Sequence, residues 1–590
     1  RKLLARVLSA CSDIELSAWY MDDGGLVARR FVLVKAWKVI LRDGPRFGLF
    51  VKEVKSLRFW PAAFGGIPDP DAVPADMLTL QEARSWGAIP VRTDGCDLLG
   101  APLTVSGADY VRSSVVSNTL GPMSKGLRAL TSLLEGFPQV QCAILRASLG
   151  LPKLRHVLAT IPPSMIEEQL ASIDDQITET VAIVLDVKNP SPFTQRVWKL
   201  PQKCSGLGFG SAQVEAAPAF ISTLVATRSW REFVHHKSVD SMPEELYSSA
   251  WSTLINALPK VDHFARLATP FRASAAHIPP SPAPVVPQVI VTRADARSLL
   301  NTLSHDKLFV DLYQVSNVRQ RAILFTGMDR GARTAVTLTP RSAEGTVVAK
   351  NSFRRLAKYA SGVPLFLPRV NAPPLQCHFC GDMMDVWGDH TSTCRLSGLT
   401  SVKHNGLRDL NRAQLKRANL DVSLEPVGLV ENPASRPADV LVRNFLRSKT
   451  TWIDHTVVGP FSSTLLNNAA LIPGHAVWFK ENLKRKGAEE ACEALGAVFA
   501  PFAVSTVGGL GNVALAVLRL IAARTAHQCR TNFGQELGFL IREATMSVHR
   551  GNNTMWEQQE FALDPLPAKA GGRCKGAQSK PGPRDYGRRR

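Results

Sequence analysis

The sequence is poor in cysteine, and it lacks both a visible secretion signal and any internal repeat of fixed period. Its ten cysteines among 590 residues are too scattered to form a disulfide framework, which excludes a disulfide-stapled scaffold. Three of them cluster with a histidine, a pattern that suits a reducing compartment and one metal site. We therefore expect an intracellular protein, nuclear or cytoplasmic. Because the chain begins with Arg1 rather than Met, we expect a fragment.

Long uninterrupted apolar segments are also lacking. Residues 494–518 carry no charge and are long enough to cross a bilayer. However, Pro501 and the turn-forming run Gly508-Gly509-Leu510-Gly511 divide this segment. We predict a strand, a turn and then a helix in a soluble core, and we expect no membrane partner.

Acidic residues are comparatively few. The chain has 50 Asp and Glu against 70 Lys and Arg, so its formal net charge is +20. This surplus favours a polyanionic partner, with nucleic acid ahead of an anionic membrane surface. Residues 569–590 hold eight basic residues and one acid, and the rest of the surplus is spread through the body of the chain. An extended nucleic-acid track would require such a spread.

Proline-rich breaks divide the chain, which we predict to be an α+β multidomain protein. Five prolines lie within 279–287, and Ala372-Pro373-Pro374 forms a second break. Apolar periodicity is lost after about Asn552. In order, we expect a strand–helix part (1–110), a largely helical part (111–275), a proline-rich linker (276–290), a mixed strand–helix part of unassigned role (291–370), a Cys/His segment (371–400), an α/β domain (401–550) and a basic disordered tail (551–590).

The first acidic motif is a pair of adjacent aspartates. Apolar and polar residues alternate over 14–21, which predicts a half-buried strand leading into Asp22-Asp23-Gly24-Gly25. Two carboxylates at the tip of a β-hairpin can hold divalent cations, as metal-assisted phosphoryl transfer requires. The alternative is an ordinary solvated turn. For comparison, Asp174-Asp175 lies among apolar residues at helical spacing, so we predict the solvated face of an amphipathic helix there.

The Cys/His cluster has the spacing Cys377-x2-Cys380-x9-His390-x3-Cys394. Two thiolates separated by two residues can grip one ion, and one helical turn can bring His390 and Cys394 to the same face. Four N/S ligands in tetrahedral reach select Zn²⁺ and leave no open position for catalysis. We predict a structural zinc knuckle, with His404 as a weaker spare ligand. The alternative is that the four residues are unrelated.

A second pair of acids lies on two expected strands. Asp439 stands at the start of the strand over 436–442, and Asp454 lies inside the strand over 451–458. A turn centred between Leu446 and Arg447 would place the two carboxylates opposite each other. Facing carboxylates repel unless a cation lies between them, and an unpaired acid inside an apolar run costs several kcal/mol. The alternative is a structural strand pair with surface acids.

Several motifs of the N-terminal half resemble reverse transcriptases. Trp19-Tyr20-Met21-Asp22-Asp23 resembles their aromatic-x-Asp-Asp motif, and 49–61 resembles the next palm segment, with its lysine at Lys55. Residues 98–103 resemble the primer-grip strand, and 141–156 and 206–212 resemble the thumb of retrotransposon polymerases. The resemblance implies the end of a polymerase palm with Mg²⁺ at Asp22 and Asp23, followed by a helical thumb. Fingers and a third palm carboxylate are missing, so we do not expect this fragment to polymerise alone.

The C-terminal half resembles the restriction-like PD-(D/E)xK nucleases of non-LTR retrotransposons, in which a Cys-Cys-His-Cys knuckle precedes an Arg/Lys-Pro-Asp strand. Here Ala438 separates Pro437 from Asp439, and Thr456 stands where the motif has lysine. The resemblance implies that Asp439 and Asp454 bind Mg²⁺ for DNA strand cleavage. It also implies a catalytic lysine, which we expect from the helix after His475, with Lys484 or Lys486 as the candidates.

Together the motifs predict the C-terminal portion of a retrotransposon protein. Its nuclease would nick target DNA, and its polymerase would extend that end on an RNA template, in target-primed reverse transcription. The main alternative is a catalytically incomplete, nucleic-acid-binding remnant of a retroelement. A free-standing nuclease is a further alternative, but it leaves the Asp22-Asp23 motif unexplained.

Overall fold

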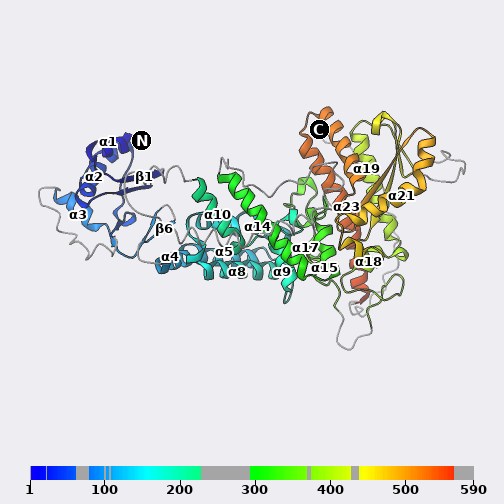
Figure 1. The fold of residues 1–590 in the computed structure, drawn as a ribbon, viewed down its shortest axis with the longest axis horizontal. Coiled ribbons are helices and arrows are strands. Elements are labelled where there is room, and N and C mark those ends of the chain that lie inside the picture. Colours follow the sequence, from blue (N-terminus) through cyan, green and yellow to red (C-terminus); the bar gives the residue numbers. More distant parts are fainter. Residues whose placement is uncertain are drawn as a thin grey trace, which may run out of the picture.

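The computed structural model describes residues 2–20, 23–60, 79–98, 101–104, 108–226, 293–367, 374–426 and 438–563. Over these residues the fold is mixed α and β, mostly helical, with small sheets. The molecule is elongated, with a small N-terminal lobe at one end, helices in the middle and an α/β lobe at the other end (Figure 1). None of the described helices combines the length and apolar character that crossing a membrane requires.

The N-terminal lobe contains short strands and helices, as its sequence predicts. Apolar side chains of its first two helices, among them Val7, Ala36 and Ile40, form a small core. Within 98–103, the segment that resembles a primer grip, the described residues belong to two antiparallel strands, with Leu98 opposite Ala101. The elements are α1 (Lys2–Ala10), β1 (Leu16–Tyr20), β2 (Asp23–Val27), α2 (Arg30–Asp43), η1 (Gly44–Phe47), η2 (Glu53–Lys55), β3 (Arg58–Phe59), α3 (Leu80–Ala88), β4 (Val91–Arg92), β5 (Cys96–Leu98) and β6 (Ala101–Leu103).

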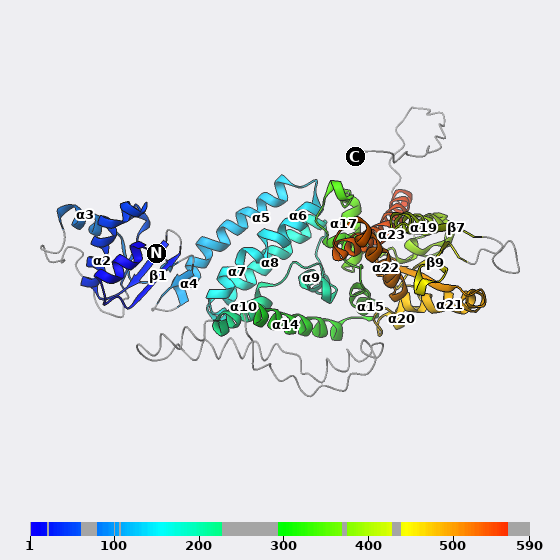
Figure 2. The ribbon, with the colours of Figure 1, turned by 90° about the horizontal axis from the view of Figure 1, so that it is seen from above.

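The middle of the molecule confirms the predicted helical part over 111–226, whereas 227–275 lies outside the described residues. Helix α5 packs against α8, and α10 packs against α7 (Figure 2). The elements are α4 (Ala108–Val115), η4 (Val116–Leu120), α5 (Gly121–Leu133), α6 (Pro138–Ile144), η5 (Leu145–Leu149), α7 (Leu151–Thr160), η6 (Pro163–Met165), α8 (Glu167–Leu185), α9 (Pro192–Lys199), η7 (Gln202–Cys204) and α10 (Ala212–Ala226).

The prediction that Asp174 lies on a solvated helix face was wrong. Its side chain is only 2% exposed, with the Ser211 hydroxyl and the Ala212 backbone N–H, at the start of α10, both donating to its carboxylate. Lys199 lies 3.6 Å away. The positive end of a helix and a nearby cation stabilise a buried carboxylate, and helical spacing within α8 alone could not reveal them. Asp175 is exposed, as predicted.

The described part of the next segment, 293–367, contains helices and turns but no strand, so the prediction of mixed strand and helix was wrong there. Residues 322–327 are buried on all sides, and a short apolar run of this kind does not distinguish a strand from a buried helix. These helices share one hydrophobic core with α5–α9. They are α14 (Arg293–Val315), α15 (Val318–Gly327), α16 (Thr334–Thr337), η8 (Ser342–Glu344) and α17 (Lys350–Ala360).

The C-terminal lobe is built on a four-stranded sheet with the order β10-β9-β8-β7. Strand β9 pairs antiparallel with β8 and parallel with β10. The elements are α18 (Asp389–Thr393), η9 (Arg395–Ser397), α19 (Leu399–Arg417), β7 (Val422–Leu424), β8 (Val440–Val442), η10 (Leu446–Ser448), β9 (Thr451–Val458), α20 (Leu466–Ala469), α21 (His475–Ala494), β10 (Val498–Ser505), α22 (Asn512–Cys529) and α23 (Phe533–Leu563).

Helices cover both faces of this sheet. Side chains of α19, α22 and α23 pack with Val440, Ile453 and Phe502 on one face. On the other face, Trp452 and Phe499 pack against Cys492 of α21. The strand, turn and helix predicted over 494–518 are confirmed as β10, the turn at Gly508 and α22.

The prediction of a disordered tail from residue 551 was wrong over its first part, because α23 continues to Leu563. The Trp556 indole is fully buried and donates a hydrogen bond to the Gly388 carbonyl, and the Gln559 side chain bonds the backbone at 376 and 378. A partner elsewhere in the chain therefore orders residues whose own apolar periodicity is weak. Residues 564–590 lie outside the described residues.

Two candidate metal centres

The predicted pairing of the second acidic motif is confirmed. Val440 pairs with Ile453 and Val442 with Thr451, which is the register expected for a turn centred between Leu446 and Arg447. Asp439, directly before β8, therefore lies opposite the part of β9 that carries Asp454. The two side chains are 16% and 15% exposed, so both carboxylates are largely withdrawn from water.

A histidine from a third element joins the two acids. One ligand atom from each of His404, Asp439 and Asp454 lies within 4.8 Å of the others, a spacing at which the three could hold a metal ion. His404 comes from α19, and its Nε2 lies 3.0 Å from a carboxylate oxygen of Asp439. We name these three residues the acidic centre.

His455 holds Asp439 in place. Its backbone N–H donates to Asp439 at 2.6 Å, and its ring Nδ1 lies 3.3 Å from the same oxygen. The other ring nitrogen, Nε2, lies 3.0 Å from the side-chain nitrogen of Asn411 on α19. This buried network joins β9 to α19, and so it fixes the carboxylate relative to His404.

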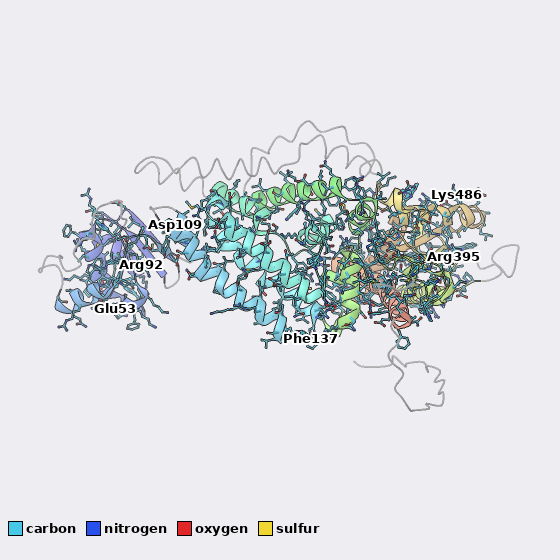
Figure 3. All side chains as sticks on the ribbon, turned by 90° about the horizontal axis from the view of Figure 1, so that it is seen from below. Glu53, Arg92, Asp109, Phe137, Arg395 and Lys486 are labelled. Atoms are coloured by element: carbon cyan, nitrogen blue, oxygen red, sulfur yellow. The ribbon has the colours of Figure 1, made fainter. Side chains whose placement is uncertain are left out.

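The lysine expected from the helix after His475 is present. Lys484 Nζ lies 2.7 Å from a carboxylate oxygen of Asp454. Lys486 is exposed and shows no side-chain partner within the described residues; Figure 3 labels it on the C-terminal lobe. A separation of two residues corresponds to a rotation of about 200° around an α-helix, so Lys484 and Lys486 point in nearly opposite directions. Of the two candidates, the structure brings Lys484 to the acidic centre.

The two carboxylates of the acidic centre have pKa values shifted in opposite directions. Burial raises the pKa of Asp454, and Lys484 only partly offsets this. Burial also opposes ionisation of Asp439, but hydrogen bonds from His404 and His455 outweigh it and lower the Asp439 pKa well below its usual range. The hydrogen bond to Asp439 in turn raises the pKa of His404. Opposed shifts within one site are typical of acid–base and metal-binding centres.

The N-terminal acidic motif is described only in part. Strand β1 pairs with β2, and Tyr20 lies opposite Asp23, which confirms a hairpin. Asp23, Gly24 and Gly25 belong to the second strand, whereas they were predicted to form the turn. Asp22 lies outside the described residues. Lys55 ends the short helix η2 and is exposed. A cation site at Asp22 and Asp23 therefore stays a prediction.

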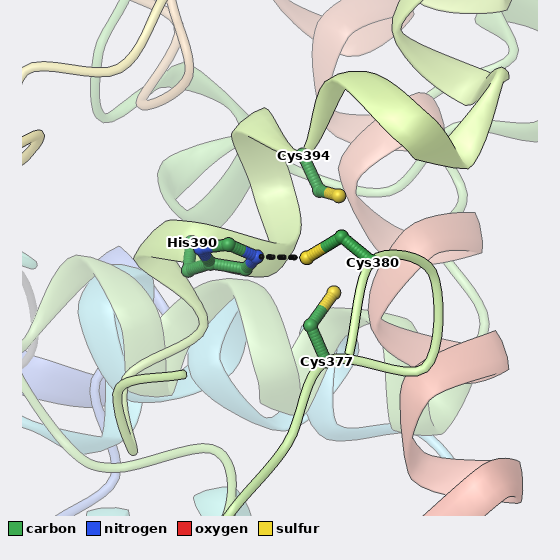
Figure 4. A group of neighbouring side chains, drawn as sticks. All are labelled: Cys377, Cys380, His390 and Cys394. Atoms are coloured by element: carbon green, nitrogen blue, oxygen red, sulfur yellow. Dashed lines mark hydrogen bonds between the residues drawn. The ribbon is translucent and has the colours of Figure 1, made fainter. Parts of the chain in front are cut away.

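The predicted Cys/His cluster is assembled in the structure (Figure 4). Cys377, Cys380, His390 and Cys394 each place a ligand atom within 4.8 Å of the others, and Cys380 Sγ lies 3.2 Å from His390 Nε2. Gly381 turns the chain in a left-handed conformation, with φ at 77°. The alternative of four unrelated residues is excluded by this geometry, and the ligand set is one that zinc prefers.

Side chains outside the cluster hold it in place. Asp385 accepts hydrogen bonds from the backbone N–H groups of Asp389 and His390, so it caps the short helix α18 that carries His390. Arg319 of α15 forms a bidentate ion pair with Asp389, at 2.8 and 3.1 Å. The knuckle is thereby fixed to the helical middle as well as to α23.

Sequence reasoning missed His404 as a member of the acidic centre, and it missed His455, which holds Asp439 in place. His404 was considered only as a spare zinc ligand, and His455 was assigned no role within the strand predicted over 451–458. The sequence spacing between His404 and Asp439 matches no motif, because α19 approaches the sheet only in the folded chain. The position of His455 directly after Asp454 was the only local signal.

Comparisons with known proteins add no further support. A scan against protein-family models gives no match, and a search of curated proteins gives no significant match.

Proposed function

We propose that the C-terminal lobe is a divalent-metal-dependent nuclease that cleaves phosphodiester bonds in DNA. The observation that carries this proposal is the convergence of His404, Asp439, Asp454 and Lys484 from four separate elements. The structural alternative, a strand pair with surface acids, predicts neither the largely buried carboxylates nor a lysine aimed at one of them.

The residues present suit a hard divalent cation. Carboxylate oxygens are the ligands that Mg²⁺ prefers, and it is commonly bound through one or two of them. A bound ion of this kind lowers the pKa of water and stabilises the charge that develops on phosphate oxygens. His404 adds a nitrogen ligand of the kind that transition metals accept, so Mn²⁺ is a second candidate ion.

The side chains of the site have separable tasks. Asp439 and Asp454 would hold the cation, and His455 keeps Asp439 ionised and oriented. The Lys484 ammonium, fixed at 2.7 Å from Asp454, would orient water or stabilise charge on the attacked phosphate. To orient water or stabilise charge, the lysine must be held in a fixed position. Helix α21, which carries Lys484, provides this because it packs against β9 and β10.

Topology gives the nuclease proposal independent support. The lobe runs α19, three antiparallel strands, α21 and then β10 parallel to β9. This arrangement places the two acids beside neighbouring strands and brings Lys484 of α21 to Asp454. The Cys/His cluster precedes β8, the strand that begins after Asp439, as the resemblance expects of a zinc knuckle, with α19 and β7 between them.

We further propose that this nuclease belongs to a retroelement protein that couples DNA nicking to reverse transcription on an RNA template. The support comes from the β1–β2 hairpin that carries Asp23 and from the helical part that follows it. A nucleic-acid-binding remnant would share these features but would lack cleavage, so activity separates the two.

The test is nicking of supercoiled DNA by the full chain with Mg²⁺ or Mn²⁺. Asp439→Ala and Asp454→Ala should each lower the nicking rate at least about a hundredfold, since metal stabilisation of the transition state is worth several kcal/mol. Asp421→Ala is the matched control, because Asp421 is an exposed acid of the same lobe whose side chain pairs, among the described residues, with Arg443 alone. Nicking that survives both active-site changes would refute the assignment, and a folded but inactive wild-type chain would favour the remnant.

A further inference from the structure

A cavity lies where the helical middle meets the C-terminal lobe, and no residue of either candidate metal centre lines it. Its volume is about 1140 Å³. The residues between α15 and α16 line it from one side, and the end of α19 and the first turns of α23 line it from the other. We name it the junction cleft.

The junction cleft is strongly basic. Six basic side chains line it against three acidic ones. Two of the acids are already neutralised, because Glu344 pairs with Arg341 and Arg542, and Glu536 pairs with Arg417. The third, Asp329, has its pKa raised to about 8 by burial, so it adds little negative charge near neutral pH. The remaining basic residues are Lys203, Arg330 and Arg333.

One positive charge beside the cleft, that of Arg333, is buried and fixed by hydrogen bonds. Its side chain is 2% exposed, and its guanidinium donates only to neutral groups: the Ser205 carbonyl and hydroxyl and the carbonyls of Ala360 and Ile323. Within the described residues no carboxylate pairs with it. A buried cation without a counter-charge is costly, and an anion in the adjoining cleft would compensate it.

Arg330 is the accessible counterpart of Arg333. It is exposed, its side chain has no ion pair among the described residues, and its backbone carbonyl is tied to Leu510 N–H at 3.0 Å. The loop that carries it is therefore fixed, while the guanidinium stays available to a ligand.

We propose that the junction cleft binds the phosphodiester backbone of a single-stranded nucleic acid. The size of the cavity, slightly above that of small-molecule pockets, admits a few nucleotides but not a duplex turn. A nucleotide pocket would need a free surface for the base. The only aromatic ring lining the cleft, Phe539, already has Arg417 and Arg542 against it, at 5.5 and 5.7 Å. Recognition through phosphates rather than bases fits this arrangement.

The junction cleft would hold a part of the nucleic acid that lies away from the acidic centre, and it is not a second cleavage site. Arg417 follows His404 by 13 residues on one helix, which places the cleft about 20 Å from the acidic centre along α19. A stacked strand would span this distance with about six nucleotides. That the ligand is a nucleic acid rests on the proposed function. The charge and the shape of the cleft are observed independently of that proposal.

The experiment measures binding of a fluorescent single-stranded oligonucleotide to the full chain, without divalent metal, over a range of salt concentrations. Arg330→Ala combined with Lys203→Ala, the two exposed basic residues that remain, should weaken binding about tenfold. It should also reduce the log–log salt slope by about 1.4, since each phosphate contact to a single strand contributes about 0.7. The control combines Arg519→Ala with Lys188→Ala, two exposed basic residues outside the cleft, and should leave the slope unchanged.

Two outcomes would overturn the inference. One is an equal slope in the cleft variant and the control variant, with both shown to be folded by thermal unfolding. The other is a mononucleotide that displaces the oligonucleotide at equal concentration, which would make the cleft a nucleotide pocket. Binding through Arg330 in a chain that never nicks DNA would defeat the nuclease proposal and leave this inference standing.

Discussion

The Cys/His cluster and the acidic centre are both assembled for a metal, but in opposite ways. The four ligands of the cluster lie within 377–394 and form a complete set. The acidic centre draws His404, Asp439 and Asp454 from distant elements, and Lys484 occupies the adjoining position. A complete set of protein ligands leaves a metal no free position, whereas a partial one leaves room for water and substrate. The difference fits a structural role for the first centre and the reaction that we propose for the second.

Zinc removal is the largest expected effect and tests the first half of this comparison. Cys377→Ser should abolish binding of about one zinc per chain and lower the melting temperature of the C-terminal lobe by about 10 °C or more, because structural zinc binding contributes folding free energy directly. Metal analysis and calorimetry measure both effects. Cys529→Ser, at an exposed cysteine outside the cluster, should change neither. A metal-free chain that melts normally would show that the knuckle is not a zinc site.

Substitution of Lys484 tests the second half of the comparison, the catalytic role proposed for the acidic centre. It should change the rate of DNA nicking and leave the thermal stability unchanged. Lys484→Ala should lower the nicking rate by about a hundredfold, as loss of a single preorganised charge-stabilising group commonly does. Lys486→Ala is the matched control on the same helix and should retain full activity. Melting temperatures of both variants should equal that of the wild type. Equal activities would mean that the Lys484–Asp454 contact has no catalytic role.

The last prediction concerns a buried histidine of α23, the helix that packs on both regions, and its effect appears only as the pH is lowered. His549 is buried, neither ring nitrogen has a hydrogen-bond partner among the described residues, and burial together with nearby Arg333 lowers its pKa to about 4. The unfolded chain binds this proton more readily, so stability should fall as the pH drops from about 6.5 to 4, by up to about 3 kcal/mol.

Urea unfolding at several pH values measures this dependence. His549→Leu should flatten it over that range, whereas His527→Leu, at an exposed histidine of α22, should not. Because α23 packs on both the knuckle and the sheet, zinc release and loss of sheet signal should occur together. Separate transitions would show that the two regions are independent.

Local patterns predicted the parts of the molecule whose partners lie nearby in the sequence. Strand alternation identified the first hairpin, ligand spacing identified the knuckle, and the positions of Asp439 and Asp454 identified their pairing register. Each of these depends on a period or a turn of a few residues, which the chain carries with it wherever it folds.

Predictions of burial were less secure. Asp174 was misread because the hydroxyl, the helix end and the lysine that compensate its charge come from α9, α10 and the loop between them. Residues 551–563 were misread because the knuckle, about 170 residues earlier, supplies their packing partner. A one-dimensional pattern does not contain such partners, since solvation depends on what other segments cover a side chain.

The sequence by itself determined the chemistry that is available: four soft ligands at metal spacing, two acids on facing strands, and a surplus of positive charge. Only the tertiary structure decided that Lys484 rather than Lys486 meets Asp454, that His404 joins the acids rather than the knuckle, and that Arg333 is buried beside an open cleft. The physical reason is that these choices depend on how helices dock against the sheet and against one another. Docking is set by the packing of whole faces and not by the spacing of a few residues.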